Sequence, residues 1–475
     1  MNKKKRADAI ASRKTKIVCT LGPATSSEDM IRSLILKGVD CFRLNFSHGT
    51  LEEHSNRIRT IRKVARELSK VVAVMQDLPG PKIRVGLLKN GVIQLKRGDN
   101  VELVEESNYT GRNYEIPINM EKLSESIVKS STISLADGTI KLRVIGEQKG
   151  KVKCLCMQGG QLVSGKGVNI AGLKYSGLTQ RDRELIKFGL EQSVDFVAVS
   201  FVKSSKDMVE ARNEVAVSSE NPLLIAKIEK KEAVKDLVNI IRESDCIMVA
   251  RGDLGVENPL ELVPIIQKRI INLAMQNSKP TITATQILES MVLNPSPTRA
   301  EVTDIANAII DGTDALMLSE ETAVGRYPLA CVEVLDKVAR VTEMKMMRNW
   351  RHAEISSRND VKSSLAEAAV KISKEINSEA IITLSDSMEF VAGVSRHRPQ
   401  APVIVPTDSD SKMRKLNIVW GVKPVEFNRS SMKADDIAAS IASKLGLNGK
   451  KLCVAVGKEA MGEGGLFVFR PKINS

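Results

Sequence analysis

The chain has 475 residues, of which 42% are hydrophobic, 27% are charged and 3% are aromatic, and its net charge is +14. This length predicts two or three domains, and the mixture of charged and apolar residues is typical of a globular, soluble protein. No apolar run approaches the roughly 18 residues that a membrane-spanning helix needs, and the basic segment 3–6 is not followed by the apolar core of a signal peptide. Composition therefore argues against a membrane protein, and we expect no membrane partner.

The net positive charge indicates which binding partners are compatible with the chain, and the cysteines indicate its cellular compartment. A charge of +14 fits either a nucleic-acid partner or an enzyme that acts on anionic metabolites. Aromatic residues for base stacking are scarce and the lysines are scattered, so we expect no nucleic-acid partner. The seven cysteines are spread along the chain without clustering, which predicts a reducing, cytoplasmic location.

Eight short apolar segments, each followed by an amphipathic helical pattern, occupy most of the first 345 residues. This alternation predicts a (β/α)8 barrel with a parallel sheet. Thr25 with Glu28, and Thr179 with Asp182, have the spacing of helix capping boxes, and Gly38 is expected to end the first helix. The expected strands are 16–20, 39–46, 71–77, 195–200, 223–227, 245–251, 281–285 and 315–319.

Two stretches depart from this alternation. Between 77 and about 175 the sequence is strand-like and rich in turns, which predicts a β-barrel domain inserted after the third barrel strand, at the mouth where a lid would lie. After 345 a second α/β pattern predicts a doubly wound C-terminal domain with strands 380–384, 402–406, 422–427, 451–457 and 465–470. The expected domains are the barrel (1–78 and 175–345), the lid (79–174) and a C-terminal regulatory or interface domain (346–475).

Polar or ionisable side chains follow nearly every expected barrel strand, at the end where barrels of this type carry their active sites. Because side chains alternate along a strand, Lys227 and Glu229 point the same way, and so do Arg251 and Asp253. Carboxylates suit Mg2+, and a neighbouring lysine suits an anionic substrate such as a phosphate. The other strand-end residues are Thr20, Arg43, Asn45, Ser47, Asp77, Ser200, Thr285 and Ser319.

Seven long motifs in order along the chain resemble those of pyruvate kinases, and the resemblance covers the barrel, the insertion and the C-terminal domain. It implies transfer of the phosphoryl group of phosphoenolpyruvate to ADP, giving ATP and an enolate that is then protonated to pyruvate. It also implies Mg2+ or Mn2+ as cofactor and a homotetramer. The motifs are KIVCTLGPA (16–24), FRLNFSHG (42–49), IAKIE (225–229), MVARGDLG (248–255), ATQILESM (284–291), PTRAEVTD (297–304) and MLSEETA (317–323).

The resemblance also assigns roles to single residues. Glu229 and Asp253 hold the divalent cation, Lys227 places a charge on the transferring phosphoryl group, and Arg43 forks onto the phosphate. Backbone N–H groups of Arg251, Gly252 and Asp253, with the hydroxyl of Thr285, bind the substrate carboxylate. Thr285 and Ser319 take part, through water, in protonation of the enolate. The nucleotide contacts are Asn45, His48, Arg84 and Lys166.

Two departures from the family pattern bear on ions and regulation. Many members hold K+ near the equivalents of Asn45, Ser47, Asp77 and position 78, but this chain has Leu78 and Lys82 in that region. The ammonium of Lys82 would supply the missing charge, so we expect no K+ requirement. In the C-terminal domain Met388 and Phe390 stand where a phosphate-binding loop has a glycine and a hydroxyl, and Asp386 and Glu389 would repel phosphate, so we expect no activation by fructose 1,6-bisphosphate.

Three other functions remain open from the sequence. A Mg2+-dependent lyase or mutase acting on an enolate would share the carboxylates but would not need the nucleotide residues. An aldolase forming a Schiff base through Lys227 is disfavoured, because Glu229 favours the charged ammonium whereas a nucleophilic lysine must be neutral. A nucleic-acid-binding protein is suggested only by the net charge.

Overall fold

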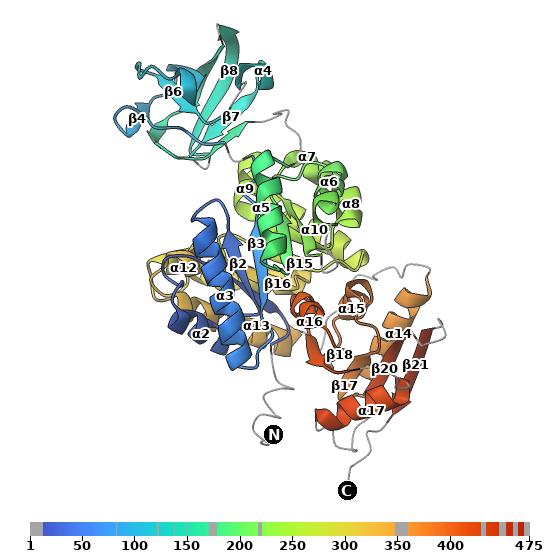
Figure 1. The fold of residues 1–475 in the computed structure, drawn as a ribbon. Helices are drawn as coiled ribbons and strands as arrows, with labels where there is room; N and C mark the ends of the chain where they lie inside the picture. The colour runs from blue at the N-terminus through green and yellow to red at the C-terminus, as the bar shows by residue number, and fades with distance from the viewer. Residues whose placement is uncertain are drawn as a thin grey trace.

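A computed structural model of the chain describes residues 13–81, 83–120, 123–136, 138–148, 150–170, 178–216, 221–346, 360–428, 434–445, 453–458 and 464–469. Eight parallel strands close into a barrel, which confirms the predicted (β/α)8 fold (Figure 1). Around the ring they are β1 (Lys16–Leu21), β2 (Cys41–Asn45), β3 (Ala73–Asp77), β12 (Phe196–Val199), β13 (Leu223–Ile228), β14 (Cys246–Ala250), β15 (Thr281–Ala284) and β16 (Ala315–Leu318).

Helices surround this barrel and pack their apolar faces against the outward side chains of the strands, while a second set of buried side chains fills the interior. The barrel is therefore a packed core and not a pore. The main helices are α2 (Glu28–Leu36), α3 (Leu51–Glu67), α5 (Gln180–Glu191), α6 (Ser205–Val215), α8 (Leu237–Glu243), α10 (Val263–Gln276), α11 (Arg299–Asp311) and α13 (Pro328–Met346). Short helices lie at the strand ends: α7 (Lys231–Lys235), α9 (Arg251–Glu257) and α12 (Glu320–Ala323).

The helix-start predictions were right at one site and wrong at another. Thr179 and Asp182 form a full capping box at the start of α5. The predicted box of Thr25 with Glu28 does not form, because Ser27 caps α2 by accepting the N–H of Met30. The hydroxyl of Thr25 instead donates to the carbonyl of Thr322, which ties the first strand's loop to the last one. The turn at Gly38, where φ is +97°, ends α2 as predicted.

Four aspartates mark the opposite, N-terminal end of the barrel. Each stands immediately before an even-numbered strand of the ring and accepts the backbone N–H of a residue at the start of the preceding strand, over 2.7–2.9 Å. Each is also paired with an arginine, so its charge is compensated. The four aspartates, with the residues whose N–H they accept, are Asp40 (Ile17), Asp195 (Val74), Asp245 (Leu224) and Asp314 (Thr281).

The insertion lies between β3 and α5 and forms two sheets around one apolar core, at the top of Figure 1. Backbone bridges join Arg84 to Gly167 and Val85 to Ile118, near the two edges of the larger sheet, so that this sheet curls toward a barrel. In sheet order the larger sheet has β11 (Val168–Ile170), β7 (Thr132–Leu135), β8 (Ile140–Gln148), β9 (Lys151–Gln158), β5 (Asn100–Glu105) and β6 (Glu115–Ile118). The smaller one pairs β4 (Val92–Leu95) with β10 (Gly160–Val163).

The C-terminal domain has a five-stranded sheet with helices on both faces, as a doubly wound domain requires. Its helices are α14 (Val361–Glu375), α15 (Met388–Ser395) and α16 (Asp410–Leu416) on one face, and α17 (Ala434–Lys444) on the other. Its strands, in sheet order, are β19 (Val422–Glu426), β18 (Val403–Thr407), β17 (Ala380–Thr383), β20 (Cys453–Lys458) and β21 (Gly464–Phe469), the last antiparallel to β20.

This domain docks on the N-terminal end of the barrel, away from the lid (Figure 1). The buried guanidinium of Arg398 donates to Asp314 over 2.9 Å and to the carbonyl of Gly312, and Arg414 pairs with Asp195 over 2.8 Å. Asn417 donates to the carbonyls of Asp40 and Val71. The C-terminal domain is therefore held by the side chains of two of the four barrel aspartates and by the backbone carbonyl of a third.

Of the predicted domain boundaries, 78/79 falls directly after β3, 345/346 falls at the last turn of α13, and 174/175 lies outside the described residues.

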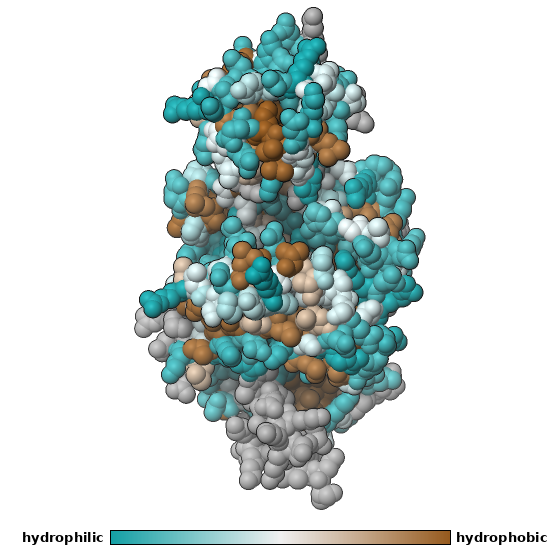
Figure 2. Space-filling view, turned by 90° about the vertical axis from the view of Figure 1, so that its left-hand side faces the viewer, coloured by the Kyte–Doolittle hydropathy of each residue, from teal (hydrophilic) through white to brown (hydrophobic). Residues whose placement is uncertain are grey.

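On the face shown in Figure 2, apolar residues occur in small separate groups within a mostly hydrophilic surface. No helix in the described ranges is long and apolar enough to cross a membrane.

Candidate active site

Lys227 lies at the C-terminal end of β13 with its ammonium group enclosed by oxygen atoms. Its Nζ donates to Ser200 Oγ over 2.7 Å and to Asp77 Oδ1 over 3.1 Å, and it lies 3.0 Å from Glu229 Oε1. Burial alone would lower the pKa of Lys227, but the charges of Asp77 and Glu229 outweigh burial and raise that pKa above its ordinary value. The raised pKa favours the charged ammonium, which argues against a role as a Schiff-base nucleophile.

Asp77, at the end of β3, links this lysine to Arg43 of β2. Arg43 donates from Nε to Asp77 Oδ2 over 2.6 Å and from Nη1 to Thr20 Oγ1 over 3.0 Å. Burial favours a higher pKa for Asp77, but the charges of Lys227 and Arg43 lower it below its ordinary value. Asp77 is thus a fixed negative charge that orients two cations toward the barrel mouth.

Glu229 and Asp253 line one small cavity of about 80 Å3 together with Lys227 and Arg43. Glu229 Oε2 accepts the N–H of Phe201 over 2.7 Å, whereas its buried Oε1 accepts no well-directed hydrogen bond from the described residues. Burial and the nearby charge of Asp253 raise the pKa of Glu229 against the opposing effect of Lys227.

This donor set fits a divalent cation such as Mg2+. Both candidate ligands are hard carboxylate oxygens, and the buried Oε1 of Glu229, 3.0 Å from Lys227 Nζ, accepts no well-directed hydrogen bond from the described residues. Within the described ranges no cluster of three or more His, Cys, Asp or Glu side chains is placed to hold a metal ion. Two carboxylates completed by substrate oxygens and water are the usual coordination of Mg2+ at phosphoryl-transfer sites.

The predicted carboxylate-binding loop starts where β14 runs directly into α9. Gly252 donates its N–H to Thr285 Oγ1 over 2.8 Å, and Thr285 itself has a left-handed backbone with φ of +67°. A Cβ atom at Gly252 would lie 3.6 Å from Thr285 Oγ1, so the protein's own atoms leave room for a methyl group there. Arg251 does not line the cavity: its guanidinium pairs with Asp304 and donates to the carbonyl of Thr285, which fixes this loop.

Ser319 is placed behind the site rather than in it. Its Oγ is buried and has no hydrogen-bond partner among the described residues, and it does not line the small cavity, to which β16 contributes Met317. Its N–H donates to Glu321 over 2.6 Å, and Glu321 also accepts the N–H of Leu288 over 2.9 Å. The role of Ser319 in protonating the enolate stays a prediction.

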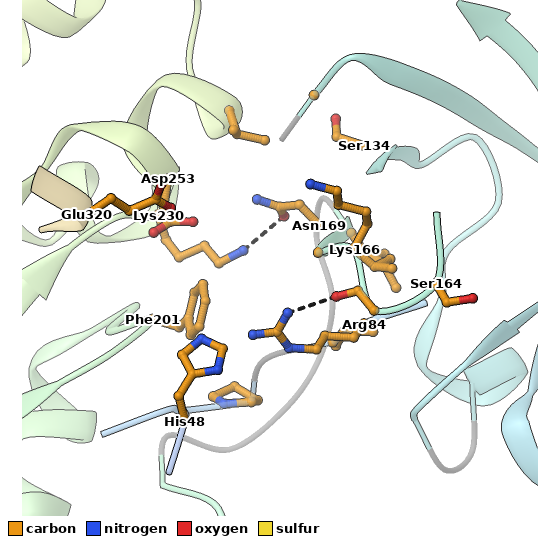
Figure 3. Close-up of a pocket in the computed structure, with 18 residues that line it drawn as sticks. His48, Arg84, Ser134, Ser164, Lys166, Asn169, Phe201, Lys230, Asp253 and Glu320 are labelled. Atoms are coloured by element: carbon orange, nitrogen blue, oxygen red, sulfur yellow. Dashed lines mark hydrogen bonds between the residues drawn. The ribbon is translucent and has the colours of Figure 1, made fainter. Parts of the chain in front are cut away.

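A larger pocket of about 460 Å3 lies between the barrel mouth and the lid (Figure 3). Three of the four predicted nucleotide residues line it: His48 from the barrel, and Arg84 and Lys166 from the lid. The fourth, Asn45, lines the small cavity instead. Asp253 and Phe201 line both spaces, so the two are neighbours.

The region expected to replace a K+ site is described in part. Asn45, Ser47, Asp77 and Leu78 all line the small cavity, and Ser47 donates its N–H to Asn45 Oδ1 over 3.1 Å. Lys82 lies outside the described residues. The absence of a K+ requirement therefore stays a prediction.

The loop at Met388 begins helix α15 in the C-terminal domain. Ser387 accepts the N–H of Phe390 over 3.3 Å and so occupies one of the donors that a phosphate would need. Asp386 accepts hydrogen bonds from Thr407 and Lys412, over 2.8 Å and 3.2 Å. The protein's own side chains thus occupy groups that would bind an anion.

Sequence reasoning missed four residues of these pockets. Ser200 was noted only as a strand end, yet it donates to the carbonyl of Leu78 and accepts from Lys227. Phe201, Lys230 and Asn169 line the larger pocket and come from three separate segments. The available signal was position: Ser200 and Phe201 follow a barrel strand, and Lys230 follows Glu229 directly.

Comparisons with known proteins agree with this geometry. The family described as pyruvate kinase, barrel domain, matches residues 12–332, and that described as pyruvate kinase, alpha/beta domain, matches residues 363–466. A relative named pyruvate kinase from Agrobacterium vitis is 44% identical over 86% of each chain. Pyruvate kinase 2 of Synechocystis sp. is 43% identical over 87% of this chain and 70% of its own, and a pyruvate kinase of Staphylococcus aureus is 41% identical over 94% and 78%. The chain therefore belongs to the pyruvate kinase family and is a phosphotransferase.

Proposed function

We propose that the chain transfers the phosphoryl group of phosphoenolpyruvate to ADP at the barrel mouth, giving ATP and the enolate of pyruvate. The observation that carries this proposal is the charged ammonium of Lys227, held between Asp77 and Glu229 on the wall of a cavity that adjoins the lid pocket. In the transfer, the bond from phosphorus to the enol oxygen breaks and a bond from phosphorus to a terminal β-phosphate oxygen of ADP forms.

Lys227 and Arg43 stabilise the transferring group. Negative charge spreads over the equatorial phosphoryl oxygens in the transition state, and a preorganised cation in a water-poor site stabilises it without reorganisation. Asp77 holds both cations in place. A divalent cation held by Glu229 and Asp253 would neutralise charge on the phosphoryl and enolate oxygens.

The loop at Gly252 and the hydroxyl of Thr285 position the carboxylate end of the substrate. Gly252 N–H donates to Thr285 Oγ1 over 2.8 Å, and a carboxylate that accepted hydrogen bonds from both groups would replace one interaction with two. Thr285, with the buried hydroxyl of Ser319 behind it, takes part in protonation of the enolate carbon. The proton reaches the carbon through water. His48, Arg84 and Lys166 bind the nucleotide from the two sides of the larger pocket.

The test measures the formation of pyruvate from phosphoenolpyruvate in the presence of ADP and Mg2+, in wild type and in Lys227→Met. A charge about 4 Å from the phosphoryl group at an effective dielectric constant of about 20 is worth about 4 kcal/mol, so kcat should fall about 1,000-fold. If the variant turns over as fast as wild type, the assignment of Lys227 is wrong. Release of pyruvate and inorganic phosphate without ADP would instead show that the phosphoryl group is transferred to water, and it would contradict transfer to the nucleotide.

We further propose that Lys82 removes the need for K+, as its position in the sequence suggests. Rates in tetramethylammonium and potassium salts at equal ionic strength should agree in wild type, and Lys82→Glu should create dependence on K+. A large stimulation of wild type by K+ would contradict this. Homotetrameric assembly, a cytoplasmic location and the lack of response to fructose 1,6-bisphosphate stay predictions.

A further inference from the structure

We propose that Lys230 is a positioning residue that fastens the lid to the barrel beside the nucleotide pocket, and that this fastening sets the affinity for ADP. The inference rests on the proposed function, since it names a residue for the nucleotide half of that site. Lys230 is the first residue after Glu229 and before α7, and it is only 7% exposed.

The ammonium of Lys230 contacts three segments that are distant in sequence. It donates to Asn169 Oδ1 over 3.0 Å, in the lid strand β11, and it pairs with Glu257 at the last residue of α9 (Figure 3 shows the contact with Asn169). It also lies 5.3 Å from the centre of the Phe201 ring, on the loop that follows β12. A lysine has three N–H donors, so these contacts account for the whole head group.

This arrangement argues for positioning and against direct phosphate binding. The side chains of Lys230 and Glu257 are 9% and 8% exposed, so each neutralises a charge that would be costly to bury alone. Lys230 therefore brings no net charge to the pocket, unlike Lys166 and Arg84 on the lid side. What its removal would change is the placement of the parts it joins.

Those parts carry the groups that the nucleotide and the substrate need. Asn169 is three residues after Lys166, near the point where the chain leaves the lid. This segment is bonded to the segment where the chain enters the lid, because Val85 N donates to the Lys166 carbonyl and Arg84 donates to the Gly165 carbonyl. Glu257 ends the helix whose first turn holds Asp253. A bond at Lys230 thus fixes the distance between the lid cations and the barrel carboxylate that face each other across the pocket.

The decisive variant is Asn169→Ala, because it removes the lid end of the contact and leaves the strand of Glu229 intact. Loss of one charge-assisted hydrogen bond should raise the KM for ADP about 10-fold or more, while the KM for phosphoenolpyruvate stays near the wild-type value. Lys230→Met should have at least the same effect, and the double variant should be no worse than Lys230→Met alone. Lys230→Arg, which keeps the charge and the donors, should restore much of the loss.

Lys231→Met is the matched control: it removes the same charge one residue away, from an exposed side chain at the start of α7. A second readout does not depend on activity. Hydrogen exchange of the β11 amides should be faster in Asn169→Ala and Lys230→Met than in wild type and Lys231→Met.

Unchanged exchange together with equal changes in both KM values would overturn the proposal. If Lys230→Met fails to fold, Asn169→Ala alone decides. If wild type shows no ADP-dependent turnover, the proposed function fails, but the exchange result still tests the contact between lid and barrel.

Discussion

Replacing Arg398 by methionine should destabilise the protein without touching its chemistry. The guanidinium has a side-chain exposure of 1%, donates to Asp314 over 2.9 Å and lies 4.9 Å from the ring centre of Trp420. Breaking one side of a buried pair costs about 3–5 kcal/mol, because the remaining charge is left buried without its partner. Asp314 would keep the N–H bonds from Thr281 and Trp420, so we expect the lower end, about 3 kcal/mol.

Urea unfolding followed by tryptophan fluorescence measures this loss, because Trp420 is fully buried beside the pair. Lys63→Met is the control: its ion pair with Glu28 is exposed, so its loss should change the free energy of unfolding far less than Arg398→Met does. Asp314→Asn combined with Arg398→Met should cost less than the sum of the single changes, and kcat should be unaffected, since the pair lies at the end of the barrel opposite the active site. A loss below about 1 kcal/mol for Arg398→Met, or strict additivity, would refute the reasoning.

Three further outcomes are expected. Arg43→Lys should lower kcat/KM for phosphoenolpyruvate about 10- to 150-fold in steady-state assays, because an ammonium lacks the planar fork with which Arg43 contacts Asp77 and Thr20 through Nε and Nη1 and still offers N–H groups to a phosphate. Gly252→Ala should melt like wild type, since its methyl group has room, but should raise the KM for phosphoenolpyruvate, because the methyl faces the Thr285 hydroxyl; an unchanged KM would contradict carboxylate binding there. In the lid, burial alone would raise the pKa of Glu115, but hydrogen bonds from Lys151 and Thr110 lower it from 4.5 to about 2. That stabilisation is complete above pH 4.5 and is lost as pH falls toward 2, so Glu115→Gln should flatten the acid dependence of lid unfolding, measured by hydrogen exchange.

The barrel strands could be predicted because each is a short apolar run that ends in a polar residue, and both signals are local. The grouping of Lys227, Glu229 and Asp253 followed from strand alternation and from the rule that barrel sites lie at strand ends. The contact of Lys227 with Ser200 could not be read this way, because it depends on how neighbouring strands are placed around the ring.

Local patterns also failed where two of them competed. Thr25 and Glu28 have capping-box spacing, but Ser27 is an equally good cap one residue before the helix and it is the residue used. The contact of Lys230 with Asn169 joins residues from the barrel and the inserted domain, and no spacing in the sequence indicates it. Predictions therefore failed where two local signals competed for one helix end, and where the information lies between elements.

The four aspartates at the base of the barrel divide it into four two-stranded units, each locked at its own starting end. The lid interrupts one of these units, the pair β3 and β12, whose register is nevertheless held by the bond from Val74 to Asp195. Register in that unit is thus set at the end remote from the insertion, so the length and sequence of the inserted domain can vary without shifting Asp77 against Ser200. The pairing of β3 with β12 therefore does not depend on the inserted domain. Replacement or deletion of that domain between β3 and α5 should leave a folded barrel.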